Sequence, residues 1–252
     1  MTLSPHNRRI VDQFTRWAKP FADLPIHAEE DAMARTVQAC APAPDMETLD
    51  VACGPGILAC ALAGHAAHVT GIDITPAMIA QAKARQAASG RENLSWQIGD
   101  ATTLPFADGR FDRVTTRYSF HHMPDPAAAL AEMKRVCRPG GRLVVIDATP
   151  SPATRQAYDI MERLRDPSHT SALPLDDLRR IGREAGLREA AIDGYRLAAR
   201  LDTLADADDM PALTAMFEAD IASGADRIGV GAWRDQDGIH FHFPVSIVAW
   251  EI

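Results

Sequence analysis

Residues 49–58 read LDVACGPGIL and residues 71–74 read GIDI, and these two stretches decide the fold. A strand, a glycine turn, a helix and a second strand that ends on an acid open a doubly wound nucleotide-binding fold. Gly54 permits a sharp turn, and Gly56 lacks the Cβ that would keep a ligand from the backbone. Asp73 follows near the spacing of about 20 residues at which such an acid binds ribose hydroxyls. The pattern predicts a nucleoside-containing ligand.

Two residues of this segment discriminate between nucleotide ligands. A pyrophosphate needs backbone N–H donors and no nearby negative charge. Asp50 is acidic and Pro55 has no N–H, so the turn suits a ligand that ends in an ammonium group, such as S-adenosylmethionine. Ala59 completes a G-x-G-x-x-A pattern with Gly54 and Gly56, which keeps a nicotinamide cofactor and an oxidoreductase open as the alternative.

Strand and helix patterns alternate along the chain after residue 46. Strands are predicted near 47–53, 68–73, 94–99, 111–117, 142–148, 188–197 and 239–250, and helices at 56–65, 76–89, 126–137 and 174–186. Thr75, Pro76 and Gly90 bracket the helix 76–89 as N-cap, first helical residue and stop. Strands separated by helices predict an α/β fold with a parallel, doubly wound sheet.

Composition limits the partners and the compartment. The net charge of −8 argues against the broad basic face that nucleic-acid binding needs. The longest apolar run, residues 51–64, contains Gly-Pro-Gly and predicts no membrane segment. Four cysteines without a C-x-x-C pair are typical of reduced thiols. We therefore expect a cytoplasmic protein that binds neither nucleic acid nor membrane.

A set of motifs over roughly residues 45–150 carries a family resemblance. The motifs are LDVACGPG (49–56), GID (71–73), GDA (99–101), LPF (104–106), FDRV (111–114), HHMPD (121–125) and RPGG (138–141). In this order the chain resembles the class I S-adenosylmethionine-dependent methyltransferases, in the small-molecule branch similar to ubiquinone and menaquinone biosynthesis methyltransferases. The resemblance implies a Rossmann-like, mostly parallel seven-stranded sheet with an antiparallel last strand, a helical lid, and S-adenosylmethionine as cofactor.

The resemblance also implies roles for individual residues at the cofactor. In the family, the acid at Asp100 accepts from the adenine amino group and the backbone N–H at Ala101 meets a ring nitrogen. Ile74 and Met78 would sandwich the adenine, although Met78 suits a core position equally well, and Asp100 could instead cap its own turn. The implied cofactor residues are Asp50, Ala52, Gly54, Pro55, Gly56, Asp73, Ile74, Met78, Asp100, Ala101 and Arg117.

Candidate catalytic groups follow the later strands. Methyl transfer from a sulfonium is an in-line displacement, so a base is needed only if the acceptor must lose a proton. His121 and His122 follow the strand 111–117, and Asp147 ends the strand 142–148. The carboxyl ends of such strands bind ligands, so these three are the candidate catalytic residues. The paired histidines could instead only orient their loop.

The remaining expectations concern the acceptor and the domain organisation. By resemblance, Phe14 and His27 cap the methionine end or the substrate, and Arg165 and His169 would contact an anionic substrate unless their segment is only a structured turn. We expect one domain, with a helical lid (1–46), a cofactor-binding core (47–150), a substrate-side cap with the last helices (151–236) and a terminal strand (237–252). The lid and the cap would enclose a small metabolite.

No metal site is expected from spacing. His240 and His242 share one face of a strand, but no third ligand stands at a recognisable distance along the chain, so an exposed strand face is favoured. The sequence leaves open whether the acceptor atom is oxygen, nitrogen or carbon, and what the oligomeric state is. A second alternative, a protein that binds S-adenosylmethionine without transferring its methyl group, also stays open.

Overall fold

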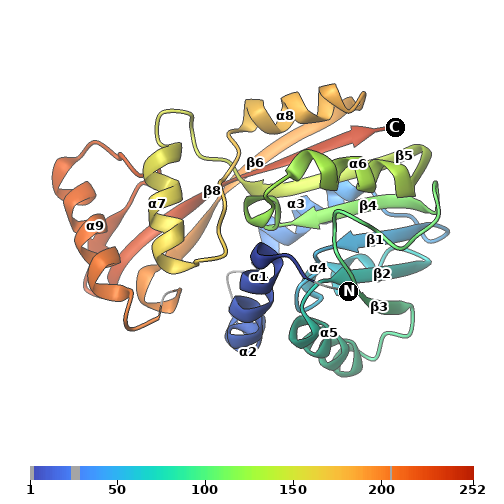
Figure 1. Ribbon diagram of the computed structural model, residues 1–252, viewed down its shortest axis with the longest axis horizontal. Helices are drawn as coiled ribbons and strands as arrows, with labels where there is room; N and C mark the ends of the chain where they lie inside the picture. Colours follow the sequence, from blue (N-terminus) through green and yellow to red (C-terminus); the bar gives the residue numbers. More distant parts are fainter. Residues whose placement is uncertain (1–2, 24–28, 205) are drawn as a thin grey trace.

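The computed structural model describes residues 3–23, 29–204 and 206–252, and a single twisted sheet forms its centre (Figure 1). The strands follow the order β3-β2-β1-β4-β5-β8-β6, and β7 pairs with β8. β1 to β5 are parallel, whereas β8 runs antiparallel to β5, β6 and β7. Their bounds are β1 (Glu47–Val51), β2 (His68–Asp73), β3 (Leu94–Ile98), β4 (Phe111–Arg117), β5 (Cys137–Ala148), β6 (Arg188–Arg200), β7 (Trp233–Asp235) and β8 (Gly238–Glu251).

This topology confirms the predicted doubly wound, mostly parallel sheet with an antiparallel last strand. The prediction of seven strands missed β7, which has only three exposed residues and therefore no apolar pattern. The strand order reverses between β1 and β4, which are neighbours although they are far apart in the sequence. Ligands of open α/β sheets bind at such a switch point, outside the carboxyl ends of the strands.

Helices cover both faces of the sheet. The helices are α1 (Pro5–Arg16), α2 (Ala18–Asp23), α3 (Glu30–Cys40), α4 (Ile57–Leu62), α5 (Pro76–Ser89), α6 (Pro126–Val136), α7 (Arg155–Arg165), α8 (Leu175–Glu184) and α9 (Met210–Ser223). Residues of α6 and α8 join one apolar cluster with the sheet, and residues of α3 and α4 join another. α8 approaches closely because Gly182 has no side chain: a Cβ there would lie 2.5 Å from the indole of Trp250.

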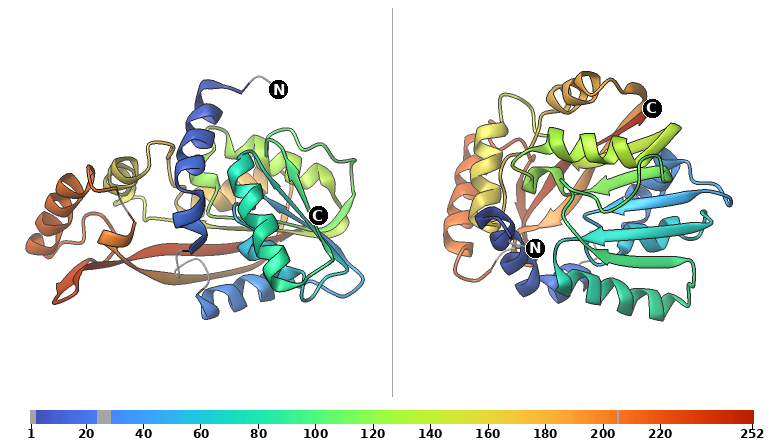
Figure 2. Two further views of the ribbon diagram at one scale, coloured as in Figure 1. Left: turned by 90° about the horizontal axis from the view of Figure 1, so that it is seen from below. Right: turned by 45° about the vertical axis from the view of Figure 1, so that its right-hand side comes forward.

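A third apolar cluster lies away from the parallel strands. It joins α7 and α9 to the outer ends of β6 and β8, with Tyr158, Phe217 and Phe241 fully buried in it. Figures 1 and 2 show α1 between this end of the molecule and the β1–β5 core. We call the α7–α9 layer and the strand ends beneath it the cap.

Most predicted elements are observed, and the differences have local causes. β5 begins at Cys137 instead of 142, because Cys137 already pairs with Phe111 of β4 before the register shifts and Arg142 pairs with Arg113. α5 begins at Pro76 as predicted, but the Thr75 side chain makes no capping hydrogen bond. In the described ranges, none of the helices has the length and apolar character that crossing a bilayer requires.

Candidate functional site

A cavity of about 1050 Å³, counting its solvent-open part, lies at the carboxyl ends of β1 to β4. We call it the cofactor cavity. Ten of the eleven predicted cofactor residues line it: Asp50, Ala52, Gly54, Pro55, Asp73, Ile74, Met78, Asp100, Ala101 and Arg117. Residues that are scattered over 68 positions of sequence thus meet at one edge of the sheet, because β1 to β4 are parallel neighbours.

Gly56 is the predicted cofactor residue that does not line this cavity, and the reason assigned to it is wrong. A Cβ on Gly56 would lie 2.6 Å from the Trp96 ring and 3.0 Å from the Ala82 Cβ, so its missing side chain makes room for packing between α4, α5 and β3. A Cβ on Gly54 would meet no atom within 4 Å. Gly54 alone of the two therefore leaves the backbone open to a ligand.

Asp50 is a buried acidic residue that lines the cofactor cavity. The residue is 1% exposed, and its Oδ2 has no hydrogen-bond partner in the described part of the chain. Burial raises the pKa of Asp50 to about 7, against the opposing effect of the Arg117 guanidinium. An unpartnered buried carboxylate oxygen is costly unless a ligand cation reaches it, so this atom fits the ammonium group of S-adenosylmethionine.

Asp73 holds the glycine turn in shape. Its Oδ2 accepts from the backbone N–H of Gly54 at 2.9 Å, and its Oδ1 accepts from that of Thr75 at 2.8 Å. Burial raises the pKa of Asp73, although these two N–H groups oppose the shift. Each carboxylate oxygen can accept a second hydrogen bond, so the side chain can orient the turn and still bind ribose hydroxyls.

Asp100 caps its own turn and also lines the cofactor cavity. Its Oδ1 accepts from the backbone N–H of Thr102 at 2.9 Å, which is the turn-capping alternative. Its Oδ2 accepts from Nδ2 of Asn7 at 2.7 Å, which ties α1 to the cofactor cavity. Met78 is likewise both a cavity-lining residue and 2% exposed.

Several lining residues were missed by the sequence analysis: Asn7, Ile10, Cys53 and Met123. Asn7 and Ile10 come from α1, and no local pattern in the sequence signals which face of that helix meets the cavity. Ala52 and Tyr118 adopt φ of 52° and 57°, which non-glycine residues rarely adopt. Such strained backbone is concentrated at ligand sites, and here it lies at the ends of β1 and β4.

A second cavity of about 800 Å³, counting its solvent-open part, adjoins the first. We call it the acceptor cavity. The two cavities share Phe14, Phe21, Tyr118 and His122 as lining residues. Its other walls come from the end of α1, from the cap and from the outer strands. They combine apolar residues (Trp17, Ala148, Tyr158, Leu197, Leu204, Phe243 and Val245) with the polar residues Gln13, His121, Glu162, Arg165 and Asp166.

Of the three predicted catalytic residues, His122 lines both cavities, His121 lines the acceptor cavity, and Asp147 lines neither of them. Nδ1 of His121 lies 2.5 Å from Oδ1 of Asp147, whose Oδ2 accepts from the backbone N–H of Phe120 at 2.7 Å. Although burial opposes the charged form, Asp147 raises the pKa of His121. Burial and the neighbouring His121 lower the pKa of His122 to about 3, so His122 is neutral over the physiological range.

The four predicted substrate residues have different surroundings. Phe14 lies between the cavities, with its ring edge-on to His122 at a centroid distance of 5.0 Å. Arg165 lines the acceptor cavity and pairs with Glu162 at 2.6 Å. His169 lines neither cavity and is 5% exposed. His27 lies outside the described residues.

Comparison with known proteins gives the family. A methyltransferase domain family, Methyltransf_11, matches residues 49–145. The uncharacterized methyltransferase YcgJ of Bacillus subtilis is 31% identical over 166 residues, which cover 65% of this chain and 66% of YcgJ. The YcgJ crystal structure has a TM-score of 0.80 at 24% identity and covers 88% of this chain and 99% of that chain, which supports the fold.

A second relative has a named activity. UbiE of Roseobacter denitrificans, a ubiquinone/menaquinone biosynthesis C-methyltransferase, is 39% identical over 125 residues, which cover 48% of this chain and 50% of UbiE. The matched part thus spans between half and two thirds of the length of these curated relatives. By its sheet topology and these matches, the chain belongs to the class I S-adenosylmethionine-dependent methyltransferases, in a group similar to UbiE.

Proposed function

We propose that this chain transfers the methyl group of S-adenosylmethionine to a small organic molecule bound in the acceptor cavity. The observation that carries the proposal is the shared wall: Phe14, Phe21, Tyr118 and His122 line both cavities. When bound, S-adenosylmethionine supplies a methyl group on a sulfonium sulfur, which an acceptor atom displaces in line. The protein mainly has to align the two ligands and exclude water.

In this proposal, different cofactor residues bind different parts of S-adenosylmethionine. Asp50 binds the ammonium group at the methionine end, where its Oδ2 has no hydrogen-bond partner among the residues that the structure describes. Asp73 binds the ribose hydroxyls beside the Gly54 turn, and Asp100 with Ala101 binds the adenine. The N-terminal segment 1–46 and the segment 151–236 are proposed to enclose the acceptor, because α1 and the cap both contribute walls to its cavity.

The acceptor cavity favours an apolar molecule with one hydrogen-bond acceptor. Aromatic and aliphatic side chains dominate its wall. Nε1 of Trp17 is buried and, among the described residues, has no hydrogen-bond partner. An indole N–H in that state gains a hydrogen bond when a ligand oxygen or nitrogen reaches it. We therefore propose an aromatic or isoprenoid-like acceptor that carries a carbonyl, hydroxyl or similar group.

The junction residues can handle a proton if the acceptor has one to lose. Because Nδ1 of His121 contacts Asp147, its Nε2 keeps the lone pair that could accept a proton or bind a Lewis acid. Asp147 is a positioning residue, since its oxygens contact His121 and the backbone N–H groups of Phe120 and Ala148. His122 is neutral and packs on Phe14, which suits a role in shaping the junction.

The test combines binding with product identification. Calorimetry should show that S-adenosylhomocysteine binds and that NAD(H) and NADP(H) do not. Incubation with methyl-labelled S-adenosylmethionine and a small-molecule metabolite extract should then give a labelled product by mass spectrometry. Trp17→Phe is the matched probe of the acceptor side, and it should raise KM for that product's precursor without changing the affinity for S-adenosylhomocysteine.

Three outcomes would contradict the proposal in different ways. Binding of a nicotinamide cofactor alone would restore the oxidoreductase alternative. Binding of S-adenosylhomocysteine with no labelled product from any extract would favour a protein that uses the pocket without methyl transfer. Label found only in protein or nucleic acid would refute the assignment of a small-molecule acceptor.

A further inference from the structure

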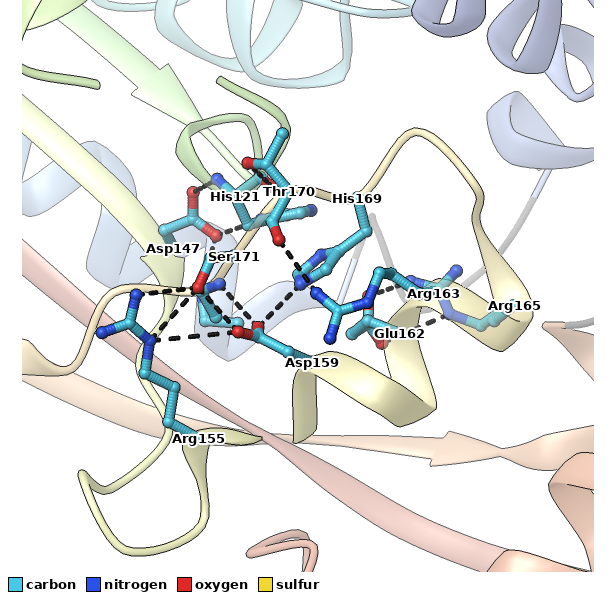
Figure 3. Close-up of polar contacts among 12 residues, drawn as sticks. His121, Asp147, Arg155, Asp159, Glu162, Arg163, Arg165, His169, Thr170 and Ser171 are labelled. Carbon is cyan, nitrogen blue, oxygen red and sulfur yellow. Dashed lines mark hydrogen bonds and ion pairs between the residues drawn. The ribbon is translucent and has the colours of Figure 1, made fainter. Parts of the chain in front are cut away.

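Two histidines and a glutamate converge beside the acceptor cavity. His121 follows β4, Glu162 lies on α7, and His169 lies in the segment after α7. One potential ligand atom from each of them, a ring nitrogen or a carboxylate oxygen, lies within 4.8 Å of the other two. Figure 3 shows the three side chains, from three separate segments, turned toward the same space.

Each imidazole is already held on one side by a carboxylate. Nδ1 of His121 contacts Oδ1 of Asp147 at 2.5 Å, and Nε2 of His169 contacts Oδ1 of Asp159 at 2.8 Å. The Ser171 hydroxyl donates to the second oxygen of Asp159 at 2.6 Å, which fixes that carboxylate (Figure 3). A ligating histidine usually donates its other N–H to a carboxylate, which fixes its tautomer and makes the free nitrogen more basic. This arrangement occurs twice here.

The second observation is an unpartnered nitrogen. The His169 side chain is fully buried, and its Nδ1 has no hydrogen-bond partner among the described residues. With the N–H of this ring directed at Asp159, Nδ1 carries a buried lone pair. Buried polar atoms nearly always have a partner, so an orphan of this kind indicates a group that the polypeptide does not supply.

Glu162 has a negative charge and free lone pairs with which to bind a cation. The Glu162 side chain is 3% exposed, and Arg165 donates to its two oxygens at 2.6 Å and 3.3 Å. Each oxygen retains a further lone pair. Arg165 thus holds Glu162 in the way that Asp147 and Asp159 hold the histidines.

We propose that His121, His169 and Glu162 bind one divalent transition-metal ion. Two imidazole nitrogens and one carboxylate oxygen favour Zn²⁺, Fe²⁺ or Mn²⁺ over the harder Mg²⁺ and Ca²⁺. Bonds of about 2.0–2.2 Å place such ligand atoms about 3–3.5 Å apart, so a modest contraction of the cluster closes the site. His121 and Glu162 also line the acceptor cavity, which places the open coordination positions on that side.

This site differs from what residue spacing predicts, since spacing along the chain pointed only to His240 and His242 as a metal-binding pair. The three ligands are separated by 41 residues between His121 and Glu162 and by a further seven to His169. If the proposed function holds, an acceptor oxygen would bind the ion at an open coordination position. In that case His121 acts as a ligand and not as a base, because both roles use the same lone pair.

The test measures metal binding alone, without cofactor or turnover. Full-length protein is freed of metal with a chelator and titrated with Zn²⁺ and Co²⁺ by calorimetry and by visible absorption of Co²⁺. We expect one ion per chain, with affinity reduced at least a hundredfold in His169→Gln and in Glu162→Gln. His240→Gln is the matched control, because His240 also contacts an aspartate, Asp235 at 3.0 Å, and it should leave the affinity unchanged.

Folding of the buried-site variants is checked by circular dichroism, and the conservative Asp159→Asn variant is measured alongside them. Asp159→Asn leaves all three ligands in place and should weaken binding by roughly ten- to a hundredfold. The proposal would be overturned if the wild-type chain did not bind one ion per chain. It would also be overturned if only His240→Gln abolished metal binding. Binding of S-adenosylhomocysteine to the metal-free chain tests the proposed function separately, so the two can fail independently.

Discussion

Replacing Asp50 by Asn should stabilise the ligand-free protein and weaken cofactor binding. Burial raises the pKa of Asp50 from 3.8 to about 7. Since the folded-state pKa is the higher one, the folded state retains the proton to higher pH, and stability falls as pH rises between these two values. Above about pH 7 the full cost of the buried carboxylate is present, and below about pH 4 it is absent.

The magnitude follows from the shift. A shift of about three pKa units, at about 1.4 kcal/mol per unit, lowers the free energy of unfolding by roughly 4 kcal/mol at pH 8. At pH 5 only the interval between pH 3.8 and pH 5 contributes, and the loss is about 2 kcal/mol. Asn is isosteric and neutral, so Asp50→Asn should recover these amounts. For a chain of this size, each kcal/mol corresponds to about 2–4 °C in Tm.

Binding should change in the opposite direction. The Asn side chain cannot pair with the ligand ammonium, and a charge-assisted hydrogen bond contributes roughly 1.5–3 kcal/mol, or about ten- to a hundredfold in Kd. Wild-type binding at pH 7 should also release a fraction of a proton, because the ligand favours the ionised form of Asp50. Calorimetry in buffers of different ionisation enthalpy measures that release.

Thermal unfolding at pH 5 and pH 8, with and without S-adenosylhomocysteine, tests the reasoning. Asp45→Asn, an exposed acid just before β1, is the control and should leave both Tm values unchanged. A gain for Asp50→Asn of equal size at both pH values would indicate packing instead of charge. No gain at pH 8, or an unchanged Kd, would refute the role assigned to Asp50.

Three further predictions separate ligand contacts from structural ones. Gly54→Ala should weaken cofactor binding and lower the free energy of unfolding by about 1 kcal/mol, because the residue has a positive φ. Gly56→Ala should lower the free energy of unfolding by roughly 1–3 kcal/mol more, because its Cβ would overpack against Trp96. Urea unfolding measures the stability of both variants, and calorimetry measures their cofactor binding. Asp73→Asn should weaken binding roughly ten- to a hundredfold, and Asp73→Ala should also lower the free energy of unfolding by about 1–3 kcal/mol, since two backbone N–H groups lose their acceptor. Asp147→Asn should lower the pKa of His121 in an imidazole NMR titration, because the main group that raises this pKa is then neutral while burial still lowers it. The His121–Asp147 pair stabilises the fold only between two limits: the stabilisation is lost as pH rises through the raised pKa of His121 and as pH falls through the lowered pKa of Asp147. Compared with the wild-type chain, Asp147→Asn should therefore lose most stability near about pH 5–6.

The parts of the site that sequence predicted are those with local signals. Gly54 and Asp73 lie on a strand–turn–helix–strand unit whose pattern is contiguous. Parallel pairing of β1, β2 and β3 then places Asp50 and Asp100 at the same edge of the sheet. The correct topology follows from the same alternation of strands and helices. Local patterns thus determined the cofactor side of the site.

The parts that sequence missed depend on packing between distant segments. Asn7 reaches Asp100 across 93 residues, and the Trp96 ring explains Gly56 although no local motif joins them. His169 was expected to contact a substrate, but the residue is buried and its Nε2 contacts Asp159 on α7. Contacts of this kind come from tertiary structure, which spacing along a chain does not encode.

The long hairpin of β6 and β8 has a consequence for the evolution of specificity. Residues 245–251 of β8 pair with β5 inside the sheet, whereas residues 238–243 continue beyond it and pair only with β6 and β7. Leu197, Leu204 and Phe243 on or beside this projecting half line the acceptor cavity. Substitutions there can reshape the substrate space while the glycine turn, 140 or more residues away in sequence, keeps its geometry. If the proposed function holds, the acceptor can therefore change through substitutions in this half of the hairpin while the cofactor side of the site stays the same.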